Sequence, residues 1–174
     1  IIDLDYINPR EPVWDPYFDL RYCIFLHTTT KYVIIRNTLL EQAGNVWYDG
    51  NIRLYNSENI RIYNCTIQNS YSSHGINVDS CDNVEIIGNL IQGNPYDGIE
   101  IEHSSNITVV NNTILNNGQH GIMNYDTPDT YIFNNTIYNC GARGINNYGV
   151  NTTILENIID TCGQQGISMY QSPN

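Results

Sequence analysis

Acidic and imidazole side chains recur at a regular spacing through the middle of this 174-residue chain. Five of them could take part in proton transfer, namely Asp79, Asp97, Glu100, Glu102 and His120. If Asp79 and Glu102 hold the same position on neighbouring strands, their carboxylates lie about 5 Å apart. Such proximity raises the pKa of one carboxyl while the other stays ionised, and acid–base cleavage of a glycosidic bond needs such a pair.

Residues that could hold a substrate lie among these groups. The set comprises His74, Asn77, Tyr125, Arg143 and Tyr148. His74 or His120 could take a proton near neutral pH, and Arg143 could neutralise a sugar carboxylate. The 14 Tyr residues are also suited to sugars, whose rings pack against aromatic faces. The alternative interpretation is an ordinary solvated strand face, because a repeat protein must expose some polar surface.

An isoleucine that follows a glycine marks a repeat of nearly constant length. The copies are Ile76, Ile99, Ile122, Ile145 and Ile167, at steps of 23, 23, 23 and 22 residues, with an earlier copy at Ile52. Within residues 98–118, three short segments alternate apolar and polar residues and are separated by Ser, Asn and Gly. Period-2 alternation predicts strands, and a repeat of this length indicates a solenoid. The prediction is an all-β fold, a right-handed single-stranded parallel β-helix of about six rungs of 22–24 residues with three strands each.

The first strand of each predicted rung would position the chemical groups. Its outward positions form two columns, Arg53, Asn77, Glu100, Met123, Asn146, Ser168 and Tyr55, Asp79, Glu102, Tyr125, Tyr148, Tyr170. A third column precedes the glycine and contains His74, Asp97, His120, Arg143 and Gln165. Strict alternation would point this third column inward, but its polar character indicates a bend that turns it outward. We therefore expect the site on the outer face of the first strands.

A further column of mostly asparagine residues supports the solenoid independently. It runs through Asn37, Cys65, Asn89, Asn112, Asn135 and Asn157, between the second and third strands. Stacked carboxamides can bond to each other along the axis and to the turn backbone. Cys65 should interrupt this ladder and lie buried as a small apolar residue.

The two ends of the chain and its cysteines suggest further expectations. Residues 1–21 are an irregular lead-in that could cover the first rung, and residues 22–174 form the β-helix domain. Residues 166–170 match the first strand of another rung without a second strand, so we expect a longer parent protein, or another domain or chain that caps this rung. Among the five cysteines, Cys140 and Cys162 share a column and could form a disulfide.

Composition narrows the choice of partner. A formal net charge of −11 with only seven Lys and Arg argues against nucleic acid and anionic membranes, and the apolar runs are too short to insert into a bilayer. We expect no metal or other cofactor, since no zinc-binding spacing occurs. Calcium is the one possibility that the acidic cluster leaves open, because its hard oxygen atoms converge.

Two segments carry a resemblance to a known superfamily. Asn106-Ile-Thr-Val-Val-Asn-Asn-Thr-Ile and Asn117-Gly-Gln-His-Gly-Ile resemble repeats of the pectate-lyase-like β-helix superfamily, especially its carbohydrate-binding and sugar-hydrolysis repeats and the related NosD-type repeats. The resemblance extends from Tyr22 to the end of the chain and implies the same fold and a carbohydrate-related role. It specifies the fold more strongly than the activity.

Two narrower likenesses accompany it. Asp97-Gly-Ile and His120-Gly-Ile are similar to repeats of bacterial alginate epimerases, in which an Asp and a His act on this face. The Asp-Pro-His motif of those enzymes is replaced here by Asn77-Val-Asp79, a departure that argues against epimerase activity. Tyr22-Cys-Ile-Phe-Leu-His with Lys31-Tyr-Val-Ile-Ile-Arg resembles methanogen surface proteins such as disaggregatase.

These observations favour an extracellular or cell-surface domain that degrades a polysaccharide, such as an acidic cell-wall or matrix glycan, as a hydrolase or a lyase. The alternative is a non-catalytic glycan-binding or surface-layer module. A NosD-like role in metal insertion is a third hypothesis, and the lack of a His, Met or Cys cluster argues against it.

Overall fold

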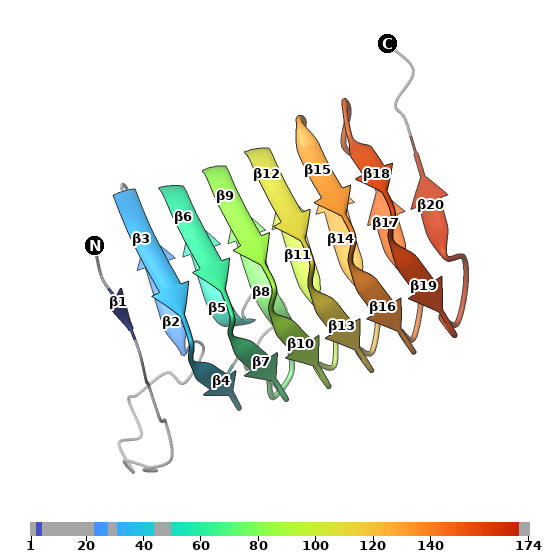
Figure 1. Cartoon of the computed structure of the whole chain (residues 1–174), viewed down its shortest axis with the longest axis horizontal. Helices are drawn as coiled ribbons and strands as arrows, with labels where there is room; N and C mark the ends of the chain where they lie inside the picture. The colour runs from blue at the N-terminus through green and yellow to red at the C-terminus, as the bar shows by residue number, and fades with distance from the viewer. Residues whose placement is uncertain (1–2, 5–22, 28–30, 44–49, 171–174) are drawn as a thin grey trace.

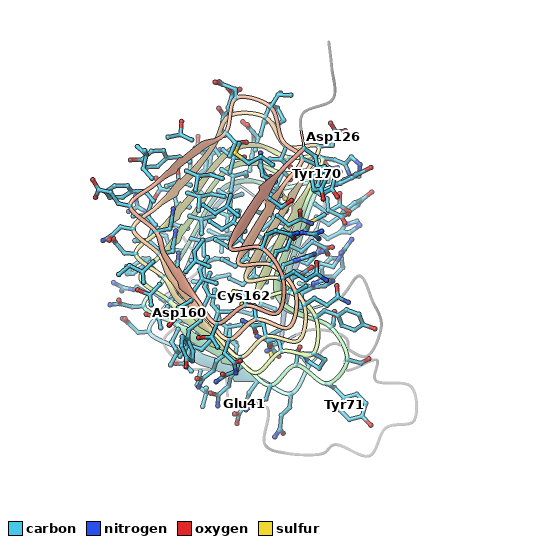
Figure 2. The ribbon with its side chains drawn as sticks, turned by 90° about the vertical axis from the view of Figure 1, so that its right-hand side faces the viewer. Glu41, Tyr71, Asp126, Asp160, Cys162 and Tyr170 are labelled. Atoms are coloured by element: carbon cyan, nitrogen blue, oxygen red, sulfur yellow. The ribbon has the colours of Figure 1, made fainter. Side chains whose placement is uncertain are left out.

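The strands of successive rungs pair in register and form three parallel sheets. A computed structural model describes residues 3–4, 23–27, 31–43 and 50–170, and these contain strands and turns but no helix. Figure 1 shows the rungs stacked side by side, and Figure 2 looks along the stack at the side chains inside and outside the ribbon. The predicted all-β parallel β-helix of about six rungs, each with three strands, is confirmed.

Each sheet is built from one strand of every rung. The first-strand sheet contains β2 (Ile24–His27), β5 (Gly50–Tyr55), β8 (His74–Asp79), β11 (Ile99–Glu102), β14 (Ile122–Tyr125), β17 (Ile145–Asn147) and β20 (Ile167–Met169). The second-strand sheet contains β1 (Asp3–Leu4), β3 (Lys31–Arg36), β6 (Glu58–Tyr63), β9 (Asp82–Ile87), β12 (Ser105–Val110), β15 (Thr130–Phe133) and β18 (Thr153–Leu155). The third-strand sheet contains β4 (Leu39–Glu41), β7 (Thr66–Gln68), β10 (Leu90–Gln92), β13 (Thr113–Leu115), β16 (Thr136–Tyr138) and β19 (Ile158–Asp160).

The isoleucine column lies where the repeat predicts it. Ile52 pairs with Ile76, and the register continues through Ile99 and Ile122 to Ile145 and Ile167. The first five are completely buried, and they face isoleucine, leucine and valine side chains from the other two sheets. Removal of this apolar surface from water stabilises each rung against its neighbours.

A buried ladder of carboxamides holds the corner between the second and third strands. Asn112 donates from its backbone N and from its Nδ2 to Asn135 Oδ1, at 2.9 and 3.0 Å. The same two bonds join Asn89 to Asn112 and Asn135 to Asn157. The second amide hydrogen of Asn112 goes to the Ile86 carbonyl at 2.8 Å. Each rung therefore satisfies polar groups that the bend leaves inside the core.

The ladder stops at Cys65, as predicted. The Cys65 backbone N still donates to Asn89 Oδ1 at 2.9 Å, but its buried thiol lies against the Ile35 and Tyr63 carbonyls. The assignment of Asn37 to this column was wrong. Leu39 pairs with Thr66, so the residue equivalent to Cys65 is the buried Thr38, whereas Asn37 is exposed at a φ of 52°.

The cysteines and the last rung show two further outcomes. Cys140 and Cys162 are both free thiols, and burial together with the neighbouring Cys162 raises the pKa of Cys140 to about 12. At the end of the stack, Ile167 and Met169 occupy inward positions but are 45% and 52% exposed. The cap that we expect over this rung stays a prediction. The expected role of residues 1–21 as a cover of the first rung also stays a prediction, because most of these residues lie outside the described ones. No described helix has the length and apolarity needed to span a membrane.

The ladder makes a prediction about stability. The substitution Asn112→Ala should lower the free energy of unfolding by about 2 to 5 kcal/mol, because it leaves several buried polar groups of two rungs without partners. The neighbouring Asn111 is exposed at a φ of 58°, so Asn111→Gly should change stability by less than about 1 kcal/mol. Urea unfolding of the two variants measures the difference, and equal losses would contradict the ladder's role.

Candidate functional site on the first-strand sheet

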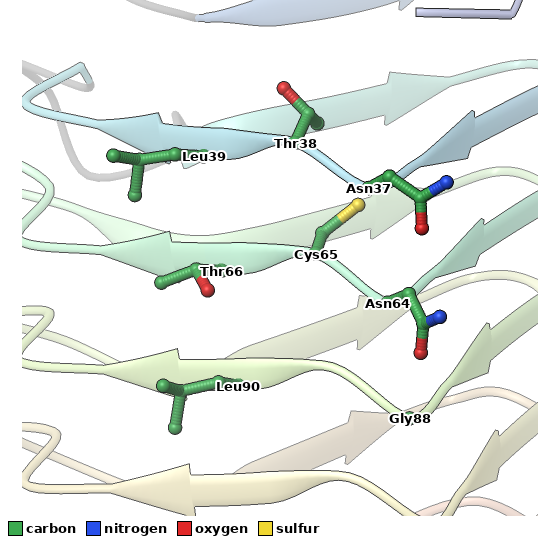
Figure 3. Close-up of a pocket in the computed structure, with 8 residues that line it drawn as sticks. All are labelled: Asn37, Thr38, Leu39, Asn64, Cys65, Thr66, Gly88 and Leu90. Carbon is green, nitrogen blue, oxygen red and sulfur yellow. The ribbon is translucent and has the colours of Figure 1, made fainter. Parts of the chain in front are cut away.

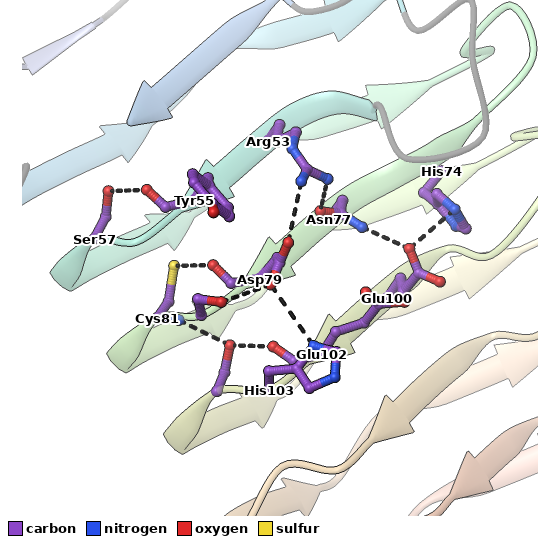
Figure 4. A network of polar contacts seen from close by, with 12 residues as sticks. Arg53, Tyr55, Ser57, His74, Asn77, Asp79, Cys81, Glu100, Glu102 and His103 are labelled. Carbon is purple, nitrogen blue, oxygen red and sulfur yellow. Dashed lines mark hydrogen bonds and ion pairs between the residues drawn. The ribbon is translucent and has the colours of Figure 1, made fainter. Parts of the chain in front are cut away.

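A continuous chain of polar contacts crosses three rungs of the first-strand sheet (Figure 4). His74 Nε2 lies 3.0 Å from Glu100 Oε2, and the same oxygen accepts a hydrogen bond from Asn77 Nδ2 at 2.5 Å. Arg53 donates to Asn77 Oδ1 and forms an ion pair with Asp79 at 3.1 Å. The sequence-predicted residues His74, Asn77, Asp79 and Glu100 are thus brought together.

The third column turns outward and along the stack, as its polar character indicated. The backbone N of each member donates to the side chain of the member one rung earlier: Asp97 N to His74 Nδ1 at 3.3 Å, His120 N to Asp97 Oδ1 at 2.7 Å, and Arg143 N to His120 Nδ1 at 3.1 Å. His74 and Asp97 are consequently buried, at 4% and 3% exposure. These bonds fix each side chain relative to the next rung.

The glycine after each member permits this close packing. A Cβ on Gly98 would lie 2.6 Å from Ile114 Cγ2 and 2.8 Å from the Gly121 carbonyl oxygen, contacts that are too short for any side chain. The Gly-Ile signal that marked the repeat therefore has a steric cause at the edge of the candidate site. Contacts of His74 with Glu100 and of His120 with Asn146 connect the third column to an outward column.

Glu100 is the carboxyl group of this cluster whose pKa is clearly shifted. Its side chain is 12% exposed although it belongs to an outward column. Burial raises the pKa of Glu100 to about 7; His74 opposes this shift, whereas Glu102 and Asp97 add to it. Glu102 also forms a side-chain hydrogen bond with Glu100. A carboxyl group that keeps its proton near neutral pH can act as a general acid.

His120 lies one rung beyond this cluster. Burial lowers its pKa, Asp97 opposes that effect and Arg143 reinforces it. Since Nδ1 accepts the Arg143 backbone N–H, Nε2 carries the proton of the neutral ring. Asn146 Nδ2, 3.3 Å from Nε2, is also a donor, so this contact is not a hydrogen bond in that tautomer. The neutral His120 is therefore held in one tautomer beside Asp97.

Arg143 and the tyrosines form a separate part of the face. Arg143 donates to Gln165 Oε1 at 2.9 Å and to the Tyr170 hydroxyl at 3.4 Å, so its side chain leans away from Glu100. Tyr125, Tyr148 and Tyr170 follow one another along the outer column, and the last two stack at 4.6 Å. Sequence reasoning placed Tyr125 and Tyr148 in the site but did not select Tyr170.

Arg53 is the other residue that the candidate list missed. Its side chain is 13% exposed and ties Asn77 to Asp79 across the first two rungs of the site. The sequence pattern already placed Arg53 first in the column that contains Asn77 and Glu100, and this position could have identified it as part of the candidate site. His103 on the following turn is 52% exposed and lies 3.9 Å from Asp79 Oδ1.

Two clusters contain donor atoms close enough to surround an ion. One consists of His74, Asp97 and Glu100, and the other of Asp79, Glu102 and His103. In the first, Asp97 lies beside Nδ1 of His74 and Glu100 lies beside Nε2. The second keeps two carboxylates on adjacent rungs, where the oxygen ligands suit the calcium that the sequence left open.

The raised pKa of Glu100 makes a prediction about stability against pH. Protonated Glu100 favours the folded state, so its contribution is complete below about pH 4.5 and is lost as the pH rises through about 7. Glu100→Gln mimics the protonated form at every pH. Its free energy of unfolding relative to that of the wild type should therefore rise by on the order of 2–3 kcal/mol over this pH interval. Urea unfolding of both proteins at pH 4.5 and pH 8 measures this. A difference that stayed constant with pH would contradict it.

Comparisons with known proteins agree on the fold. The periplasmic alginate epimerase AlgG superposes with a TM-score of 0.80 at 20% identity, over 87% of this chain and 36% of that one. Full-length tailspike protein 2 of Escherichia coli O157:H7 bacteriophage CAB120 superposes with a TM-score of 0.50 at 18% identity, over 86% of this chain and 20% of that one. The chain thus spans only a minor part of either protein, and at these identities the likeness concerns the fold alone.

The sequence itself supplies the family. No curated protein compared with the chain matches it. The family model described as a right handed beta helix region matches residues 50–174, which include every residue of the candidate site. The chain belongs to the family of right-handed β-helix regions.

Proposed function

We propose that this chain cleaves a polysaccharide on the outer face of the first-strand sheet, by acid–base chemistry in which Glu100 supplies the proton. The observation that carries the proposal is the environment of Glu100, which is nearly buried, hydrogen-bonded and raised in pKa to about 7. AlgG is named as an alginate epimerase, which supports a polymeric sugar as the substrate. Such a substrate is consistent with an extracellular or cell-surface location.

The neighbouring carboxyls suit the second role that such a reaction needs. Glu102 lies beside Glu100 on β11, and Asp79 is the register partner of Glu102 on β8. One of these two would activate water or attack the sugar while protonated Glu100 donates to the leaving oxygen. His74 and Asn77 would position Glu100 through the oxygen that they share.

Charge favours hydrolysis over a lyase reaction. Four carboxyls gather on this part of the face, namely Asp79, Asp97, Glu100 and Glu102, and Arg53 is already paired with Asp79. A lyase must neutralise the carboxylate of a uronic acid, and Arg143 leans away from this cluster toward Gln165. A neutral sugar would avoid repulsion from the carboxyls. We therefore propose a neutral polysaccharide as the substrate in preference to an acidic one.

The test is activity against a panel of neutral and uronic-acid polysaccharides. The wild type should release reducing ends, and Glu100→Gln should lower kcat/KM by about 10²- to 10⁴-fold, the usual contribution of a general acid. The wild-type rate should fall as the pH rises above about 7, where Glu100 loses its proton. Glu85→Gln is the matched control, because Glu85 pairs with Arg61 on the second-strand sheet.

Two results would redirect this proposal. Unsaturated products from uronic-acid polymers would indicate a lyase, with the same face in use. Full activity in Glu100→Gln would show that the proton donor is another group.

The tyrosine column supports a second candidate, a glycan-binding module without catalysis. Tyr125, Tyr148 and Tyr170 are 44%, 36% and 43% exposed, and they extend the outer face beyond the acidic cluster. Sugar rings can pack on such aromatic faces without any bond being broken.

Binding and cleavage can be separated with a tyrosine variant. Tyr148→Ala should weaken glycan binding about threefold to tenfold, in line with the loss of one aromatic contact. Tyr131→Ala is the matched control, because Tyr131 stacks on Phe133 on the second-strand sheet. Glycan binding that releases no product and is unchanged in Glu100→Gln would favour the binding module. Equal glycan binding by Tyr148→Ala and Tyr131→Ala would exclude the tyrosine column as the binding face.

A further inference from the structure

An exposed column of turn residues lies just outside the buried carboxamide ladder. It consists of Asn37, Asn64, Gly88, Asn111, Asn134 and Glu156, all with positive φ. Asn134 Nδ2 donates to Asn111 Oδ1 at 2.8 Å, and the same bond joins Asn83 to Asn59 and Asn139 to Asn116 in other exposed columns. In these three pairs the carboxamide bonds to the one a rung earlier, whereas among the described residues no such bond joins Asn64 to Asn37.

Gly88 interrupts this column. Its position would hold a carboxamide that accepts from Asn111 and donates to Asn64, but glycine supplies neither group. Asn111 uses its Oδ1 on Asn134, while its Nδ2 and the Oδ1 of Asn64 have no hydrogen-bond partner among the described residues. In Figure 3 the Asn64 carboxamide extends toward Gly88, whose position is bare. A hydrogen-bond donor and an acceptor therefore border a gap the size of one carboxamide.

The gap at Gly88 is open, whereas the equivalent one at Gly93 is not. A Cβ on Gly88 would lie 3.6 Å from Asn64 Oδ1, an ordinary contact, but a Cβ on Gly93 would lie 2.6 Å from Asn69 Oδ1. Asn69 therefore occupies the space beside Gly93. A missing side chain alone does not create the Gly88 site.

The surroundings of Gly88 can hold a sugar ring. A surface cavity of about 410 Å³ is lined by Arg61, Tyr63, Asn64, Ile87, Gly88 and Asn111. A second of about 540 Å³ adjoins it through Asn64 and Gly88. Volumes in this range suit small ligands. Tyr63 and Ile87 supply apolar contact beside the polar gap.

We propose that this cavity binds a sugar that carries an acetamido group, with the acetamide in place of the missing carboxamide at Gly88. The acetamide N–H donates to Asn64 Oδ1, its carbonyl oxygen accepts from Asn111 Nδ2, and the sugar ring packs against Tyr63. The site lies at the corner between the second- and third-strand sheets. It is independent of the cleavage proposed on the first-strand sheet and does not use Glu100.

The probe is di-N-acetylchitobiose, and cellobiose is the control sugar without acetamido groups. In ¹H–¹⁵N spectra, the side-chain amide signals of Asn64 and Asn111 should shift with the first and not with the second. Asn64→Gly and Asn111→Gly should each weaken binding about threefold to tenfold, the usual worth of one hydrogen bond. N-methylacetamide should bind more weakly than the disaccharide, because it has no ring to contact Tyr63.

The decisive variant is Gly88→Asn, which replaces the proposed ligand with a side chain of the protein. Asparagine tolerates the φ of 64° at this position, and the Cβ has room, so the variant should stay folded. It should abolish the shifts, while Asn139→Gly, in another exposed column, should leave them unchanged. The proposal would be overturned if cellobiose bound as well as di-N-acetylchitobiose, or if Gly88→Asn bound the latter as well as the wild type does. If N-methylacetamide bound as well as the disaccharide, the assignment of the ligand as a sugar would be overturned. Glu100→Gln should bind normally, which separates this outcome from that of the cleavage test.

Discussion

Hydrogen bonds between successive rungs hold the chain in a fixed register, and every other feature of the structure depends on that register. Ile99 pairs with Ile76 and Ile122, and each following residue pairs likewise. The pairing alone would leave polar groups inside the bends, and the buried carboxamides of Asn89, Asn112 and neighbouring rungs satisfy them. Backbone pairing sets the spacing, and the ladder fixes the corner at which the chain turns.

The same register explains how an outward face acquires a buried carboxyl. Side chains in adjacent rungs are too close together to remain separately solvated, so His74 and Asn77 cover Glu100 and share one of its oxygens. These side chains displace water from Glu100, and the loss of water raises its pKa. The third column contributes through its backbone, because each N–H orients the imidazole or carboxylate one rung earlier.

The fold could be predicted because its causes are periodic in the sequence. The Gly-Ile steps, the interruption at Cys65 and the outward columns all follow from one repeat length. Asn37 was misassigned because the first rung is longer than the others. The residue equivalent to Cys65 is Thr38, and Asn37 precedes it on an exposed turn. The columns indicated where the candidate site lies, but the directions of the side chains decided which residues contact one another. Nothing in residue type shows that Arg143 leans toward Tyr170 or that Arg53 joins Asn77 to Asp79.

The in-register stack also limits how such a surface can change. Along the axis, side-chain positions are available only at intervals of about 4.8 Å, and along a strand one face is reached only every second residue. The separation of two groups on the first-strand sheet therefore takes discrete values. Asp79 and Glu102 could not be moved apart by a small shift of backbone, because such a shift would break the pairing of their two strands. New distances would have to come from exchanging residues between grid points, or from inserting a whole rung and carrying half of the surface along with it.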